Sequence, residues 1–266
     1  MSLARIGGVV AALALVVSPI AGAVASNTTR ATPVTVYLAR STHVAPVRRL
    51  VATNGAPARA ALAALLRGPT ATEKLGGYAT AIPAGTALRS VTIAGGLATV
   101  DLTRRFALGG GSASMLLRVA QVVYTTTQFD NVDRVAFKLD GTLVRSIGGE
   151  GVVALPPVTR GTFEAQAPPI LVEQPLLGDL VSRRVTVRGT ANVFEARLVV
   201  ELQATGGTIL ARRLVSATSG TGVRGTFTTT LATPATLRQA VVVVYARSAK
   251  DGRAIDIVRV PVRVRR

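Results

Sequence analysis

Several chemically versatile residues are absent or scarce in this 266-residue sequence. It contains no cysteine and no tryptophan, one histidine (His43) and three lysines. Without cysteine, disulfide bonds, thiol nucleophiles, cysteine-ligated metals and an N-terminal lipid anchor are excluded. His43 alone would have to serve any Ser-His-Asp triad or histidine-ligated zinc, and no acidic residue stands near it in the sequence. We therefore predict no metal, no cofactor and no catalytic residue.

Aromatic and acidic residues are also few. Aromatic residues make up 4% of the chain and hydrophobic residues 48%, so the cores must consist mainly of Val, Leu, Ile and Ala. The 13 acidic residues face 31 lysines and arginines, a net charge of +18. This charge is spread evenly, and no basic cluster interleaved with aromatics indicates nucleic-acid binding. Two interpretations remain: an arginine-rich composition bias, or attraction to an anionic wall polymer or lipid.

Residues 1–25 have the features of a secretory signal peptide. Arg5 supplies a positive start, residues 6–17 are apolar, and Ala23-Val24-Ala25 fits a cleavage site. An uncleaved membrane anchor is the alternative, although the apolar run is shorter than the roughly 20 residues that a spanning helix needs. We therefore expect an exported protein, either extracellular or associated with the cell wall.

Residues 33–146 predict an α/β sandwich domain, with two helices on a small sheet. The first helix, residues 58–67, is rich in alanine and ends at Gly68-Pro69. Alternating apolar residues indicate the strands, and residues 43–46 are expected to form a loop. The predicted strands are residues 34–38, 47–53, 88–93, 97–102 and 132–139.

The second helix of this domain follows a triple glycine, residues 109–111. Ser112 or Ser114 is the candidate N-cap, and the helix is expected to end near Phe129. The triple glycine is either a flexible lead-in or, because it precedes a helix, a cradle for an anion. One helix face is predicted to pack on the sheet. That face consists of Leu116, Val119, Ala120, Val123 and Thr127.

The pattern changes after a predicted linker at residues 147–167, which is rich in glycine and proline. Residues 168–266 show short alternating strands separated by glycine turns, with no helical periodicity. Seven strands at such spacing predict an all-β, immunoglobulin-like sandwich. The predicted strands are residues 168–172, 184–189, 197–203, 208–217, 225–231, 237–247 and 254–265.

Short sequence words in both halves resemble known families. In the first half they are residues 36–38 (VYL), 65–70 (LLRGPT), Glu73, 81–86 (AIPAGT), 100–102 (VDL) and 120–125 (AQVVYT). They resemble the GerMN domain of bacterial sporulation and germination proteins. In the second half, residues 189–195 (GTANVFE), 225–227 (GTF) and 248–252 (SAKDG) resemble the immunoglobulin-like domain of bacterial spore germination. The resemblance implies a sporulation or germination role in endospore formers, whereas the arginine-rich, lysine-poor composition is typical of secreted actinobacterial proteins.

Two groups of residues are candidate binding sites. Gln121 and Tyr124 lie three residues apart on the flank of the second helix. They either face a groove that binds a glycan or peptide, or pack on the sheet with their polar atoms satisfied by backbone groups. Arg48 and Arg49 with Tyr78 form a second candidate patch, for which the alternative is an ordinary solvated face.

These observations favour a non-enzymatic binding or scaffolding protein of the bacterial cell envelope. Its partner would be a cell-wall component or an envelope protein, not a nucleic acid. One alternative is a peptidoglycan- or glycan-active enzyme that uses a carboxylate pair drawn from Glu73, Asp101 and Asp140. The other is charge-driven binding of an anionic wall polymer or lipid.

Overall fold

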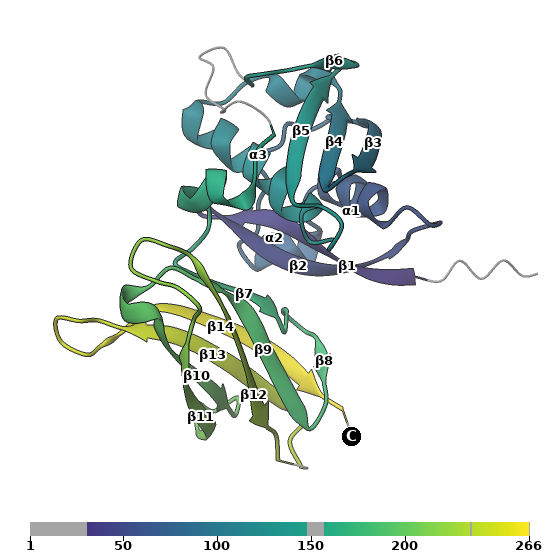
Figure 1. Ribbon diagram of the computed structural model, residues 1–266. Helices are drawn as coiled ribbons and strands as arrows, with labels where there is room; N and C mark the ends of the chain where they lie inside the picture. Colours follow the sequence, from purple (N-terminus) through teal and green to yellow (C-terminus); the bar gives the residue numbers. More distant parts are fainter. Residues whose placement is uncertain (1–30, 148–156, 235, 266) are drawn as a thin grey trace, which may run out of the picture.

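The computed structural model describes residues 31–147, 157–234 and 236–265, so the predicted signal peptide lies outside the described residues. It shows the two domains expected from the sequence, an N-terminal domain of helices and sheet and a C-terminal β-sandwich (Figure 1). Across these residues, no helix combines the length and apolar character needed to cross a membrane.

The strands of the N-terminal domain form two separate sheets. Strands β1 (Ala31–Arg40) and β2 (His43–Ala52) form an antiparallel pair. Strands β3 (Leu88–Ala94), β4 (Leu97–Leu102), β5 (Arg134–Leu139) and β6 (Thr142–Leu143) form the second sheet, in that order. Strands β4 and β5 are parallel, so the chain between them must cross over the sheet.

Helix α3 (Ser112–Thr126) makes that crossover. Together with α1 (Pro57–Leu66) it lies between the β1–β2 pair and the four-stranded sheet (Figure 1). Both faces of α3 are therefore covered, and all its residues from Leu117 to Thr126 are buried. The predicted face packs into the core, but the opposite face of the helix is buried as well, which the sequence pattern did not indicate. The N-cap is Gly111, in place of the predicted serine.

Residues 43–46, predicted as a loop, belong to strand β2. The turn before them is only two residues long, with Ser41 at a φ of 53°, so pairing resumes at His43 opposite Arg40. Pro46 fits within this strand because a two-stranded sheet has only edge strands. A short helix, α2 (Ala71–Leu75), follows α1, and Thr70 and Glu73 cap it reciprocally.

The described part of the predicted linker is packed into the protein. Val158 pairs with Val135 next to strand β5. The 3-10 helix η2 (Arg160–Gln166) then packs against α3, and Phe163 at its centre is 0% exposed. Phe163 and Leu171 belong to the same hydrophobic core as α1 and α3. A glycine- and proline-rich composition suggested a tether, but the apolar residues within the segment are buried.

The C-terminal domain consists of two facing sheets, with strand orders β11-β10-β13-β14-β8 and β12-β9-β7. All seven predicted strands are present, and the prediction missed only the short β8, which pairs in parallel with the end of β14. The strands are β7 (Ile170–Gln174), β8 (Leu180–Val181), β9 (Arg184–Ala191), β10 (Arg197–Gln203), β11 (Ile209–Ser216), β12 (Gly225–Ala232), β13 (Gln239–Arg247) and β14 (Ala254–Val264).

A buried carboxylate stabilises the larger sheet of this domain. Glu201 on β10 accepts hydrogen bonds from Gln203 Nε2 at 2.6 Å, Arg212 Nε at 2.7 Å and Tyr245 Oη at 3.0 Å. Burial by itself raises the pKa of Glu201, but these three donors outweigh it and leave the pKa below its ordinary value. The ionised form of Glu201 is therefore the form that stabilises the fold.

This arrangement predicts a loss of stability in acid. A carboxyl group with a lowered pKa in the folded state contributes stability above its unfolded pKa, about 4.3, and loses it as pH falls through the folded pKa. At neutral pH, Glu201→Gln should lower the free energy of unfolding by about 2 kcal/mol. Between pH 7 and pH 3 the variant should lose less stability than the parent. Urea titrations of parent and variant between pH 7 and pH 3 test this prediction. Glu195→Gln is the control, because the Glu195 side chain is exposed. Parallel curves for parent and Glu201→Gln would contradict the prediction.

Candidate functional site

A cleft lies at the junction of the two domains. Its volume is about 650 Å³, within the range of small-molecule and peptide sites. The N-terminal domain contributes the β1–β2 turn, the start of β2 and the segment around Tyr78. The C-terminal domain contributes β7, residues 176–177 and residues 257–261 of β14. Figure 1 shows β2 lying above β7 at this junction.

The chemistry of the cleft combines apolar surface with positive charge. The lining includes Arg40, Arg259 and His43 but no aspartate or glutamate. The guanidinium carbon of Arg40 lies 5.6 Å from the centre of the Tyr78 ring, a cation–π distance. Two exposed hydrophobic side chains, Leu177 and Ile257, also line it. This lining suits an extended ligand with apolar and anionic groups.

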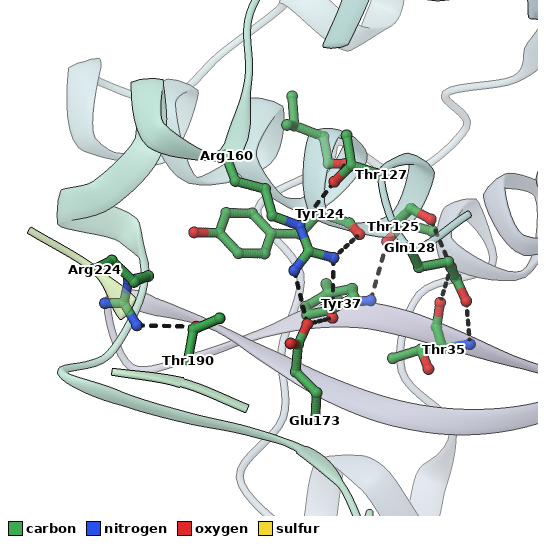
Figure 2. Close-up of polar contacts among 11 residues, drawn as sticks. Thr35, Tyr37, Tyr124, Thr125, Thr127, Gln128, Arg160, Glu173, Thr190 and Arg224 are labelled. Atoms are coloured by element: carbon green, nitrogen blue, oxygen red, sulfur yellow. Dashed lines mark hydrogen bonds and ion pairs between the residues drawn. The ribbon is translucent and has the colours of Figure 1, made fainter. Parts of the chain in front are cut away.

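Arg160 fixes the two domains against one another. From η2, its Nη1 donates to Glu173 Oε1 on β7 at 2.8 Å, and its Nε donates to Thr127 Oγ1 at 2.8 Å (Figure 2). Its Nη2 donates to the Tyr37 hydroxyl at 3.3 Å, and that hydroxyl in turn donates to Glu173. One guanidinium thus joins β1, α3 and β7.

Two tyrosine rings pack against this guanidinium. The carbon of the Arg160 guanidinium lies 4.8 Å from the Tyr124 ring centre and 5.3 Å from the Tyr37 ring centre. Burial raises the pKa of both phenols, and for Tyr37 this outweighs the opposing effect of Arg160. Burial lowers the pKa of Arg160, but interactions with Tyr37 and Glu173 raise it further, so its charge is held. At physiological pH both tyrosines are therefore neutral and Arg160 is charged. We call Arg160, Tyr37, Tyr124 and Glu173 the domain clamp.

Two further ion pairs complete the domain contact. Arg48 Nε and Nη2 donate to the two carboxylate oxygens of Asp179 at 2.9 and 3.0 Å, which joins β2 to the loop before β8. Arg224 Nε donates to Glu164 of η2 at 2.8 Å, and Asn192 donates to the other oxygen of Glu164 at 3.0 Å. Helix η2 is therefore bonded to both domains, so the cleft has fixed walls.

Gln121 and Tyr124 do not face a groove. Gln121 is 0% exposed; its Oε1 accepts from Ala81 N at 2.8 Å and its Nε2 donates to Tyr37 O at 3.2 Å. This is the packing alternative, with the amide satisfied by backbone groups. Tyr124 is buried against Tyr37 and Arg160, and its hydroxyl has no hydrogen-bond partner among the described residues. The groove orientation failed because β1 and η2 cover the side of α3 that the sequence left open.

Arg48, Arg49 and Tyr78 do not form one patch. Successive residues of a strand point to opposite faces, so the two arginines diverge. Arg48 reaches Asp179 of the other domain, whereas Arg49 reaches Glu73 at 2.5 Å and the carbonyl of Gly68 at 2.8 Å. Burial raises the pKa of Glu73, but the hydrogen bonds from Arg49 and Thr70 prevail and lower it. Only Tyr78 lines the cleft.

The carboxylates considered for an acid–base pair are each engaged by arginine. Glu73 is held by Arg49, on the α2 side of the N-terminal domain. Asp101 lies 3.5 Å from Arg89, and Asp140 lies 3.8 Å from the same guanidinium. None of the three lines the cleft. Within residues 31–147, 157–234 and 236–265, no three His, Cys, Asp or Glu side chains gather as metal ligands.

The loop at residues 106–109, which includes the first of the three glycines, binds a buried arginine that the sequence analysis missed. Arg118 of α3 donates to the carbonyls of Phe106 at 2.7 Å, Leu108 at 3.0 Å and Gly109 at 2.8 Å. Burial lowers the pKa of Arg118. These three carbonyl oxygens thus bind a cation of the protein itself, whereas an anion cradle would use backbone N–H groups. The sequence did offer one indication of this site, because Arg118 is a charged residue among the apolar positions of α3.

The fold and the cleft together describe a two-domain protein, in which ion pairs hold the domains in place and both domains line one cleft. Residues 35–145 match the family model described as Germane, sporulation and spore germination. Residues 169–253 match Gmad2, the immunoglobulin-like domain of bacterial spore germination. The chain therefore carries a Germane (GerMN-type) domain followed by a Gmad2 immunoglobulin-like domain, as the short sequence motifs indicated.

Solved structures similar to the chain include two from one sporulation protein. The first GerMN domain of GerM from Bacillus subtilis is 19% identical with a TM-score of 0.38, covering 48% of this chain and 95% of that one. The tandem GerMN domains of GerM are 16% identical with a TM-score of 0.43, covering 76% and 61%. A putative lipoprotein from Clostridium perfringens is 18% identical with a TM-score of 0.36, covering 52% and 93%. No curated protein matches significantly. The assignment rests on the two matched families.

Proposed function

We propose that this chain is an exported, non-enzymatic binding or scaffolding module of the bacterial cell envelope, and that it binds its partner in the interdomain cleft. The observation that carries the proposal is the clamped domain junction. Arg160, Arg48 and Arg224 hold two germination-type domains in one arrangement, which leaves a preformed cleft with a cationic and apolar lining. A preformed site binds without a cost for ordering its walls.

Two features support binding over catalysis. The families matched are sporulation and germination modules, and the carboxylates that an acid–base mechanism would need are paired with arginines and do not line the cleft. A glycosidase needs one carboxyl group protonated near neutral pH. Glu73, whose pKa is lowered, is unsuited to that role. Export is supported by the leader-like composition of residues 1–25.

Retention of the chain on isolated cell envelopes tests the proposal. The chain from Ser26 onward should co-sediment with envelopes of the source bacterium. Tyr78→Ala should weaken retention about tenfold, as expected when a contacting aromatic is removed from a binding site. Phe194→Ala is the matched control, because this exposed side chain lies outside the cleft lining and its loss should leave retention unchanged. Thermal melting should first show that the parent and both variants are folded. Equal retention of these three proteins would then contradict use of the cleft.

The same assay separates the two alternatives. Binding driven by charge alone should be lost by about 0.3 M salt and should not respond to Tyr78→Ala, because screening at that ionic strength is severe. An enzyme would release soluble wall fragments during the incubation, measured by chromatography of the supernatant. Retention that survives salt, without fragment release, supports a scaffolding role.

A further inference from the structure

One edge of strand β14 faces the interdomain cleft. Five consecutive residues, 257–261, line the cleft. Because successive side chains of a strand point to opposite faces of the sheet, five in a row can line one cavity only along the edge of the strand. The edge in question is the one away from β13, the neighbour of β14 over most of its length.

The hydrogen-bonding groups on this edge are identified by the residues that follow. The carbonyl of Pro261 accepts from Gly178 N at 2.9 Å, and Arg263 N donates to Asp179 O at 2.9 Å. Residues 261 and 263 thus point their backbone groups away from β13, and by the two-residue alternation so does Arg259. Strand β8 pairs only with residues 263 and 264. Within the described ranges, no backbone group pairs with the outward N–H and C=O of Arg259.

An unpaired strand edge is a template for another strand, and most proteins block such edges. Here a groove borders the edge. Side chains that could recognise a partner line the same groove: the exposed Ile257 and Leu177, and the positively charged Arg40 and Arg259. No acidic side chain lines the groove to repel an anion. The backbone edge, the apolar surface and the charge lie in one place.

We propose that the edge of β14 around Arg259 binds an extended, acidic segment of a partner polypeptide by strand addition. The proposal deepens the proposed function and rests on it, because it names the partner of the same cleft. Main-chain hydrogen bonds to Arg259 would give affinity, and alternate apolar and acidic side chains of the partner would give specificity. A second copy of this chain is a poor occupant, because pairing two β14 edges would juxtapose their arginines.

The test uses a defined peptide on the full chain from Ser26 onward. A nine-residue fluorescein-labelled peptide, in which valine alternates with glutamate and threonine, should raise fluorescence anisotropy on binding. The same peptide with lysine for glutamate, or with alternate backbone nitrogens methylated, should bind at least about tenfold more weakly. Amide exchange at Arg259 should slow when the first peptide is added, a readout that does not depend on any variant.

Three substitutions locate the site. Arg259→Gln should weaken peptide binding about tenfold, and Arg188→Gln, which removes an exposed charge on the other sheet, should not change it. Arg259→Pro should abolish binding by removing the outward N–H as well as the charge. Proline is tolerated where a strand N–H faces outward, and the amide-exchange measurement on the parent covers the case in which this variant fails to fold.

The outcomes separate this inference from the proposed function. Envelope retention that depends on Tyr78, with no peptide binding or with equal binding of the methylated peptide, would overturn strand addition and leave the proposed function standing. Binding of soluble wall oligosaccharide that slows exchange at Arg259, without peptide binding, would also overturn it. Peptide binding that protects Arg259, with no envelope retention, would support strand addition and refute the envelope role. Dimerisation that protects Arg259 without peptide would assign the edge to a second copy and overturn the proposal.

Discussion

Replacement of Arg160 by methionine should lower the free energy of unfolding by about 3 kcal/mol, the low end of the range for breaking a buried ion pair. The low end applies because the Arg160 and Glu173 side chains are each 26% exposed. Removing the guanidinium leaves the Glu173 carboxylate with the Tyr37 hydroxyl as its only described partner. It also removes the cation that packs against both tyrosine rings.

The form of the unfolding curve is the sharper measurement. The parent should unfold in urea in one transition, since η2 couples the domains. Arg160→Met should show two transitions, as expected when cooperativity between domains is lost. Arg197→Met is the control, because the Arg197–Glu195 pair is mostly exposed with a separation of 3.9 Å, and such pairs contribute about 0–1 kcal/mol. A single unshifted transition in Arg160→Met would show that the clamp does not hold the domains together.

Truncation of Phe163 to alanine should destabilise the chain by about 3–5 kcal/mol, the range for deleting a buried aromatic side chain. Phe163 lies in η2 and is one of the largest fully buried side chains. It packs into the core of the N-terminal domain together with α3. A cavity there would loosen the platform that positions Arg160, so the N-terminal domain should unfold first.

Chemical denaturation followed by tyrosine fluorescence measures this effect, because Tyr37 and Tyr124 report on the N-terminal core. The same substitution at Phe194, which is 56% exposed, is the matched control and should change stability by no more than about 0.5 kcal/mol. The two η2 substitutions should not be additive, since Arg160 and Phe163 share one short helix. If Phe163→Ala lowered the free energy of unfolding by less than Phe194→Ala does, η2 would not be part of the core.

The strands could be predicted from the sequence because alternation is a local property. The predicted strands at residues 184–189 and 197–203 lie within β9 and β10, and those at residues 88–93 and 97–102 lie within β3 and β4. Helix α1 was likewise evident from alanine and leucine spacing. These signals need only neighbouring residues, and tertiary contacts did not override them.

The site could not be predicted in the same way, because it depends on segments far apart in the chain. The periodicity of α3 identifies its apolar positions but cannot tell how many layers will cover them, so the choice between a groove and a packed position for Gln121 and Tyr124 stayed open. The partners of Arg48 and Arg160 lie 131 and 13 residues away, at Asp179 and Glu173. With 31 basic residues in the chain, sequence alone does not select which arginines form these pairs.

The shared core also sets an order of events during biosynthesis. The core of the N-terminal domain includes Val158, Phe163 and Leu171, all of which follow the last strand of that domain in the chain. A polypeptide emerging amino end first, from a ribosome or across a membrane, cannot complete this core until residue 171 is free. Until then the apolar surface that these side chains cover stays open to water. The first domain to emerge must therefore wait for the beginning of the second before it can finish folding.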